Sequence, residues 1–342
     1  MLPVRIDIIS GETGRKGPVV INIQPNLFVS PIQTVSPIEA QCCCIGAHTC
    51  LPRAKLPPLP HVTPQCRCGG SVRFTGTLSE TLNSQHTCRC VQLFLVEPES
   101  SSVPCLLSET DRNATLALCA ARDQTFYVHA PYRANLAGSF GVSSAAARSV
   151  AAHLNAIRGL PGAVVLHVGA KGGVQDVANK LNQLRADNVL VPNIHSRVPF
   201  SLLLETSAGC GTQLGRTWTE MRQLFEATDT TCVGLCVDTQ HVFAAGMSNL
   251  QTHEEVVRLF DAAYNIVGKP ISLLHLNDSE TTACSRVDRH APLTRGHIWA
   301  TNTEGLSSLV DLAAQYNIDM ISETSAPMAD VALVQKLIRD KN

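Results

Sequence analysis

The chain has 342 residues, 44% of them hydrophobic and 16% charged, against about 25% charged residues in average globular proteins. Its 27 lysines and arginines nearly balance its 28 aspartates and glutamates, for a net charge of -1. This balance excludes a general electrostatic attraction to nucleic acid, so any such contact needs a local basic patch. The sequence has neither a signal peptide core nor an apolar run of transmembrane length. We therefore expect an intracellular protein, in the cytoplasm or nucleus, without a membrane span.

The 14 cysteines are numerous for such a protein. Several lie inside apolar runs and are expected to be reduced, buried thiols: Cys119, Cys232 and Cys236. The two CRC sequences at 66–68 and 88–90, together with Cys50, could hold a zinc ion. Their spacing differs from the usual C-x2-C, so free thiols are the preferred interpretation.

In chain order, residues 1–42 are predicted to form an N-terminal extension, in which short β-rich pieces alternate with glycine and proline. Residues 43–342 then show a regular alternation of strand-length apolar runs and helical periodicity. The predicted strands are 43–48, 91–96, 125–130, 163–168, 200–205, 233–238, 271–276 and 318–323. The clearest predicted helices are 143–157, 173–184 and 253–267. A proline-rich insertion at about 50–68 interrupts the first connection and predicts a surface loop that reaches about residue 70.

Alternation of strands and helices predicts an α/β fold with a parallel sheet. The apolar runs are continuous, as is typical of strands buried on both faces. Eight strands favour a closed (β/α)8 TIM barrel, and a doubly wound open sheet is the alternative.

A metal-competent side chain marks the carboxyl end of six successive predicted strands, the third to the eighth. These residues are His129, His167, Glu205, Asp238, His275 and Glu323. In a parallel barrel these ends share one rim, where barrel enzymes place their sites. Any one of them alone would be read as a buried core histidine or a helix cap. Six at equivalent positions favour a cation, because converging carboxylates are costly to bury without one.

Three further residues of the same types follow nearby: His241, Asp288 and His290. The total of five histidines and four carboxylates suits Zn2+, with Mn2+ possible at one site and Fe2+ less favoured. Nine ligands exceed the needs of one or two ions. We therefore expect about three ions, with one carboxylate bridging two of them.

The sequence resembles the endonuclease IV family of apurinic/apyrimidinic (AP) endonucleases. The matching pieces, in family order, are IGAH (45–48), HAPYRANLAG (129–138), LHVGA (166–170), LLLETSAGCGTQLG (202–215), VDTQHVFAAG (237–246), LLHLNDSE (273–280), SRVDRH (285–290) and SET (322–324). The resemblance implies a (β/α)8 barrel that hydrolyses the DNA phosphodiester 5′ to an abasic site and leaves a 3′-hydroxyl. Its implied partner is double-stranded DNA with abasic sites, and we expect a monomer.

The resemblance also implies a division of the ligands. His129 and His167 would hold one zinc, which Glu205 bridges to a second. The second zinc would be completed by Asp238, His275 and Glu323, and the third would be held by His241, Asp288 and His290. Glu205 is the candidate catalytic residue that orients the nucleophile. The candidate DNA contacts are Tyr132, Arg286 and Arg289, whose ordinary alternatives are helix packing for the tyrosine and salt bridges for the arginines.

Several positions depart from the family pattern. Cys210 stands where the family has Gln, Glu99 stands near the place of an Arg that enters the DNA stack, and Glu280 stands where Lys is common. The sequence TRG (294–296) replaces a Gly-Glu-Gly turn. All nine ligands are retained, whereas several of the family's DNA-facing residues are not.

Two alternatives remain open from the residues. A sugar isomerase or epimerase of the related barrel class would use Glu205, Asp238, His275 and Glu323, but it leaves the other ligands unexplained. A zinc-stabilised DNA-binding protein with weakened turnover would explain the altered DNA-facing positions.

Overall fold

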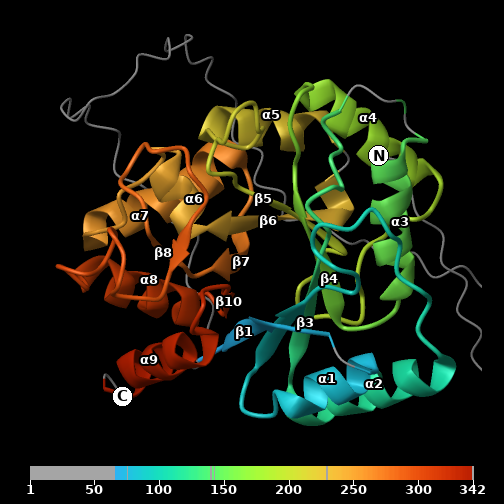
Figure 1. The fold of residues 1–342 in the computed structure, drawn as a ribbon, viewed down its shortest axis with the longest axis horizontal. Coiled ribbons are helices and arrows are strands. Elements are labelled where there is room, and N and C mark those ends of the chain that lie inside the picture. The colour runs from blue at the N-terminus through green and yellow to red at the C-terminus, as the bar shows by residue number, and fades with distance from the viewer. Residues whose placement is uncertain (1–65, 75, 139–140, 142, 229, 341–342) are drawn as a thin grey trace, which may run out of the picture. The chain divides into compact units, whose positions relative to one another are not determined.

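The computed structural model describes residues 66–340, apart from 75, 139–140, 142 and 229. Eight parallel strands close into a barrel in the order β1-β10-β7-β6-β5-β4-β3-β2 (Figure 1). The barrel strands are β1 (Cys68–Val72), β2 (Cys90–Leu93), β3 (Thr125–His129), β4 (Gly162–His167), β5 (Leu202–Glu205), β6 (Val233–Asp238), β7 (Ile271–His275) and β10 (Asp319–Ser322). This confirms the TIM barrel and excludes the open sheet.

Helices surround the strands (Figure 1). They are α1 (Leu78–Ser84), α2 (Glu109–Arg122), α3 (Ala145–Ala156), α4 (Val174–Ala186), α5 (Trp218–Ala227), α6 (Thr239–Ala244), α7 (His253–Asp261), α8 (Glu304–Gln315) and α9 (Pro327–Arg339). A 3-10 turn, η1 (Thr230–Cys232), precedes β6, and a π-helix, η2 (Ala262–Val267), continues α7. Several of these helices begin with a side chain that accepts a backbone N–H, which satisfies a donor that has no partner within the helix. These residues include Thr77, Ser108, Ser144, Thr217 and Thr252.

Two apolar clusters explain why the strand sequences are hydrophobic without alternation. One cluster lies between strands and helices and includes Leu166 and Leu204. The other fills the barrel interior and includes Val165, Leu203 and Leu273. Neighbouring residues of a strand therefore face different cores, and both are apolar. Among the described residues, no helix is both long and apolar enough to cross a membrane.

The register of the strands brings the predicted ligands to one rim. His167 pairs with Glu205 across β4 and β5, and Asp238 pairs with His275 across β6 and β7. A short antiparallel pair, β8 (Asp278–Ser279) and β9 (His290–Ala291), adds a hairpin after β7. The hairpin carries Asp288 and His290 back toward the same rim.

The first strand of the barrel is β1, not the predicted segment 43–48. The barrel closes through β1, where Cys68 pairs with Met320 of β10 and Ser71 pairs with Gln92 of β2. Residues 68–70 therefore belong to a strand, whereas the sequence predicts a loop there. A Cβ at Gly69 would lie 1.7 Å from the carbonyl oxygen of Cys90, so this tight closure requires glycine. The segment 43–48, the IGAH sequence and the boundary of the N-terminal extension lie outside the described residues.

Candidate metal centre

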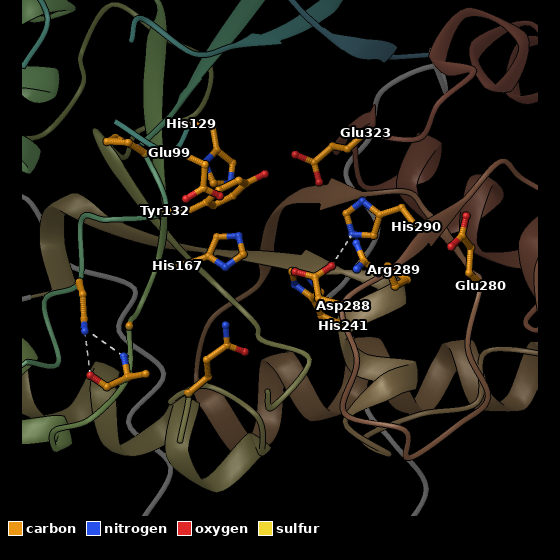
Figure 2. Close-up of a pocket in the computed structure, with 15 residues that line it drawn as sticks. Glu99, His129, Tyr132, His167, His241, Glu280, Asp288, Arg289, His290 and Glu323 are labelled. Atoms are coloured by element: carbon orange, nitrogen blue, oxygen red, sulfur yellow. Dashed lines mark hydrogen bonds and ion pairs between the residues drawn. The ribbon is translucent and has the colours of Figure 1, made fainter. Parts of the chain in front are cut away.

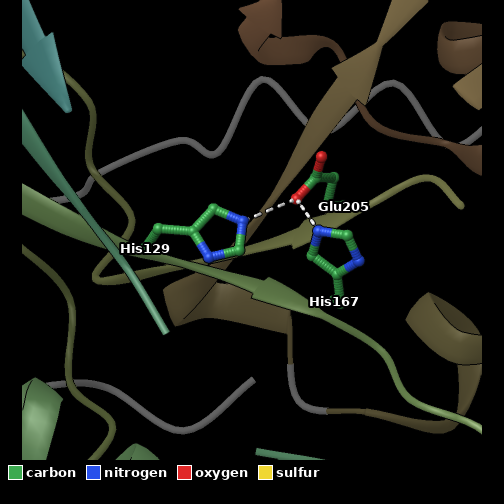
Figure 3. A group of neighbouring side chains, drawn as sticks. All are labelled: His129, His167 and Glu205. Carbon is green, nitrogen blue, oxygen red and sulfur yellow. Dashed lines mark ion pairs between the residues drawn. The ribbon is translucent and has the colours of Figure 1, made fainter. Parts of the chain in front are cut away.

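Glu205, the last residue of β5, lies at the centre of the predicted ligands and is fully buried. Its Oε2 atom is 3.4 Å from Nε2 of His129 and 3.2 Å from Nε2 of His167 (Figure 3). These histidines end β3 and β4, so three successive strands each contribute one side chain. The three ligand atoms lie within 4.8 Å of one another, close enough to share one metal ion.

The other oxygen of Glu205 faces a second group. Its Oε1 is 2.9 Å from Nδ1 of His275, and the same nitrogen lies 3.0 Å from Oε2 of Glu323 and 3.8 Å from Oδ2 of Asp238. These four residues offer ligand atoms within 4.8 Å of one another. Glu205 thus belongs to two groups through its two oxygens, as expected of a bridging carboxylate.

The third group differs from the prediction, because ligand atoms of Asp238, His241 and His290 lie within 4.8 Å of one another, whereas Asp288 lies beside the two histidines without completing that group. Nε2 of His241 lies 3.2 Å from Asp288 Oδ2, and Nε2 of His290 lies 3.3 Å from Asp288 Oδ1. Asp238 also belongs here, because its Oδ2 lies 3.6 Å from Nε2 of His290. Asp238 therefore stands between the second and third groups, as Glu205 stands between the first and second.

Three buried atoms in this cluster have no hydrogen-bond partner: Glu205 Oε2, His241 Nε2 and His290 Nε2. Such atoms are rare in folded proteins and costly to leave unpaired. Nδ1 of His129 lies 2.7 Å from the carbonyl of Ala130, and Nδ1 of His241 lies 2.8 Å from that of Thr206. With Nδ1 directed at a carbonyl, Nε2 is the ring atom left to bind a metal ion, and in both rings it faces a carboxylate oxygen. Lone pairs that converge in this way suit a divalent cation, and the donor set fits zinc.

The site also separates the pKa values of its members. Burial lowers the pKa of His167 to about 4 and keeps this imidazole neutral. Burial alone would lower the pKa of His290 too, but the charge of Asp238 and the contact with Asp288 raise it to about 9. For Glu323, burial opposes ionisation, but His275 outweighs it and lowers the pKa to about 2. Strongly shifted groups gathered in one cleft are typical of functional sites.

Two buried amides hold these ligands in place, and the sequence analysis missed both. Oε1 of Gln92 lies 2.8 Å from Nε2 of His275, and its Nε2 donates to Glu323 at 2.5 Å. Nδ2 of Asn277 donates to Asp238 at 2.7 Å and to Glu323 at 3.2 Å, while its Oδ1 accepts the backbone N–H of Glu323. A glutamine inside the apolar run VQLFLV was the available signal for Gln92. Residues that hydrogen-bond metal ligands, as Gln92 and Asn277 do here, typically hold those ligands in place.

A pocket of about 600 Å³ opens above the ligands (Figure 2). Tyr132 stands at its wall, 52% exposed, with its ring centroid 5.6 Å from those of His129 and His167. Of the predicted DNA contacts, Tyr132 and Arg289 line the pocket, whereas Arg286 is exposed outside the lining residues.

Some of the residues that depart from the family pattern line this pocket, and others do not. Glu99 and Glu280 line the pocket. Cys210 is half-buried outside it, and its backbone N–H is bonded to Gln213, which does line the pocket. Two of the departures therefore add negative charge to the wall that faces any bound substrate.

Comparison with known proteins agrees with this architecture. A family model described as a xylose isomerase-like TIM barrel matches residues 85–327, so the fold and the rim site define a barrel of that class. The chain is 32% identical over 291 residues to a probable endonuclease 4 of Streptomyces coelicolor, covering 80% of this chain and 96% of the relative. It is 32% identical over 305 residues to a probable endonuclease 4 of Streptomyces avermitilis, covering 82% and 94%. The chain belongs to the endonuclease IV family.

Solved structures show the same relationship. The crystal structure of endonuclease IV from Thermus thermophilus matches with a TM-score of 0.63 and 27% identity, over 80% of this chain and 98% of that one. A D-tagatose 3-epimerase-like protein matches with a TM-score of 0.51 and 15% identity, over 80% and 96%. The second match shows a common fold alone.

Proposed function

We propose that this protein is a zinc-dependent AP endonuclease, which hydrolyses the DNA phosphodiester 5′ to an abasic site and leaves a 3′-hydroxyl. The observation that carries the proposal is the linkage of three ligand groups through Glu205 and Asp238. A sugar epimerase that uses the second group alone would give no role to His129, His167 or Asp288. The curated relatives named endonuclease 4 support the same reaction class.

The ligand sets follow the three groups. His129, His167 and Glu205 would hold one ion, and Glu205 would share a second with Asp238, His275 and Glu323. His241, Asp288 and His290 would hold the third, beside Asp238. When bound, zinc ions would supply Lewis acidity toward the scissile phosphate and the attacking water.

The protein's own groups then position the reactants. Glu205 is fixed from both sides by histidines, so its carboxylate can orient the attacking water with little motion. The ring of Tyr132 offers a partly exposed surface at the pocket wall for a flipped-out abasic sugar. The pocket volume of about 600 Å³ lies in the range of sites for small molecules. Arg289 is exposed at the same wall and can contact a backbone phosphate.

Incubation of the purified protein with a duplex that carries one abasic analogue, with and without chelator, tests the proposal. We expect a single cut on the 5′ side of the lesion, lost with chelator and restored by zinc. Elemental analysis of unchelated protein should give about three ions per chain. Tight binding of the abasic duplex without cleavage would favour the DNA-binding alternative. One ion together with epimerisation of a ketose would favour the sugar enzyme.

A further inference from the structure

The two CRC sequences take no part in the proposed active site, but the structure brings two of their sulfurs together. Cys66 lies just before β1 and Cys68 opens it, and their Sγ atoms are 3.0 Å apart. Cys66 is half-buried and Cys68 is only 3% exposed. Cys66 is therefore the more accessible residue of the pair, and Cys68 is the protected one.

A metal site at these cysteines is not supported. Cys88 is also buried, but it does not complete a group of three ligand atoms with Cys66 and Cys68 within 4.8 Å anywhere in the part of the chain that the structure describes. Cys50, the remaining candidate ligand, lies outside that part. Within the described residues, two close sulfurs without a third ligand atom have the composition of a dithiol rather than of a tetrahedral zinc site.

The two thiols are also electrostatically unequal. The hydrogen bond with Cys68 lowers the pKa of Cys66 against the effect of burial, and the positive charge of Arg339 in α9 lowers it further. The same hydrogen bond, together with burial, raises the pKa of Cys68. A pair with one accessible thiol that ionises readily and one protected thiol is the arrangement that thiol–disulfide exchange uses.

We propose that Cys66 and Cys68 form a redox-active dithiol, which low-molecular-weight aliphatic disulfides oxidise to an intramolecular disulfide. The Cys66 thiolate attacks one sulfur of the small disulfide, forms a mixed disulfide and releases one thiol. The Cys68 sulfur then loses its proton and attacks Cys66 Sγ, which releases the second thiol. The protein loses two electrons and two protons, and the small disulfide gains both.

The position of the pair gives the oxidation a structural consequence. Arg67 lies between the two cysteines, and its guanidinium donates to Asp319 and Asp123 at 2.6 Å each. A disulfide between residues only two apart closes a small ring, and strained disulfides are readily reduced. The oxidised form would thus be reversible and would constrain the backbone at the entrance to β1.

The pair can be tested by peptide mapping, because trypsin separates the two cysteines. Cleavage after Lys55, Arg67 and Arg73 gives the peptides 56–67 and 68–73, each with one cysteine. After treatment with oxidised glutathione and blocking of free thiols, we expect these two peptides to be joined, or to appear as one uncut peptide lacking two hydrogens. Reduction should release both. The map uses the unaltered protein, so it does not depend on a variant that folds.

Two variants identify the order of attack. Cys68→Ser should trap glutathione on Cys66, and Cys66→Ser should leave Cys68 unmodified. Cys105→Ser and Cys284→Ser, which change exposed cysteines, are the matched controls and should leave the joined peptides unchanged. Stable glutathione on Cys66 in the unaltered protein, or joining of either peptide to a different cysteine, would overturn the proposal. Neither result bears on the proposed nuclease activity, so the two proposals fail separately.

Discussion

Buried ionisable side chains lie at both ends of this barrel, and the two ends differ in how completely these side chains are paired. At the amino end, Arg67 donates to Asp319 and Asp123, while the hydroxyl of Tyr127 donates to Asp319 at 2.7 Å. Arg197 adds a contact to Asp319 at 3.2 Å. Every charge in this network has an opposite charge or a donor beside it.

At the carboxyl end, Glu205, His241 and His290 each keep a buried atom without a hydrogen bond. Buried ionisable side chains thus form a closed network at one end and an open one at the other. Removing one partner of a buried ion pair leaves an uncompensated buried charge, whereas converging buried atoms without a hydrogen bond suit a bound cation. The comparison predicts that substitutions at the amino end change stability, and that substitutions at the carboxyl end change metal binding and catalysis.

The largest expected effect is that of Glu205→Gln. Loss of a residue that hydrogen-bonds a metal ligand typically lowers metal affinity or activity by about 10–100-fold. Loss of a bridging ligand should therefore lower activity by more than about 100-fold. We expect cleavage of the abasic duplex to become undetectable, with an unchanged circular dichroism spectrum and fewer bound ions by elemental analysis. Cleavage near the parent rate would show that Glu205 is not the bridge.

At the opposite end, Asp319→Asn should act on stability. It removes the buried negative charge that faces Arg67, and breaking a buried ion pair costs about 3–5 kcal/mol. We expect a drop of this size in the free energy of unfolding, measured in urea, with the bound metal unchanged. Asp123→Asn is the matched control, because its side chain bonds the same guanidinium but is 61% exposed. An equal loss in both variants would mean that burial does not decide the cost.

Two buried glutamines allow the same comparison within one residue type. Gln92→Leu removes the partner of His275 and Glu323, so we expect metal affinity to fall by about 10–100-fold, measured by competition with a chelator. Gln124, at the amino end, donates to the carbonyls of Gln85 and Cys88. Gln124→Leu should cost about 1–3 kcal/mol of stability through those unpaired carbonyls and leave metal affinity unchanged. Loss of metal in both variants would indicate a general loosening of the fold.

These two glutamines also show what the sequence could reveal. Strand ends that carry His, Asp or Glu are visible in a linear pattern, because each apolar run has the ligand at or near its end. A glutamine inside an apolar run signals a buried polar group but not its partners, since His275 and Glu323 come from segments far along the chain. The register of β2, β7 and β10 brings them together, and register is a property of the closed barrel.

The first strand was missed for a related reason. The sequence CGGSV has two glycines and little hydrophobicity, which are ordinary signs of a loop. Gly69 is nevertheless required by the close approach of the Cys90 backbone, a constraint that exists only between two paired strands. The membership of Asp238 in the third group was hidden likewise, because its neighbour His290 arrives on a hairpin whose direction the sequence does not specify.

Removal of the metal should make stability depend on pH at the carboxyl end. The pKa of His167 is about 4 in the folded protein, against an ordinary value of 6.5. As the pH falls from 6.5 to about 4, the unfolded chain binds a proton that the folded protein does not, so the free energy of unfolding decreases. The raised pKa of His290 acts oppositely, and its contribution is lost as the pH rises through about 9. The measurement is urea denaturation of chelated protein across this pH range. In His167→Asn, the acidic limb, which is the fall in stability between pH 6.5 and about 4, should be flatter. An unchanged acidic limb in His167→Asn would assign the dependence to other groups.

The smallest effect is expected from the exposed charge at the pocket wall. A protein of net charge -1 needs a local basic patch to attract DNA, and Glu99 places a carboxylate on the same wall as Arg289. Glu99→Arg should therefore tighten binding of the abasic duplex by about fivefold or less, since single exposed charges contribute at most about 1 kcal/mol. If the new arginine reaches a phosphate, the slope of log affinity against log salt should steepen by about 0.9.

The control is Asp187→Arg, which makes the same charge change at an exposed residue after α4, at the amino end. It should change neither the affinity nor the salt slope beyond a weak general attraction. An equal gain in affinity from both variants would mean that DNA binding depends on the total charge of the protein. It would contradict the prediction that the carboxyl end of the barrel is the surface that faces DNA.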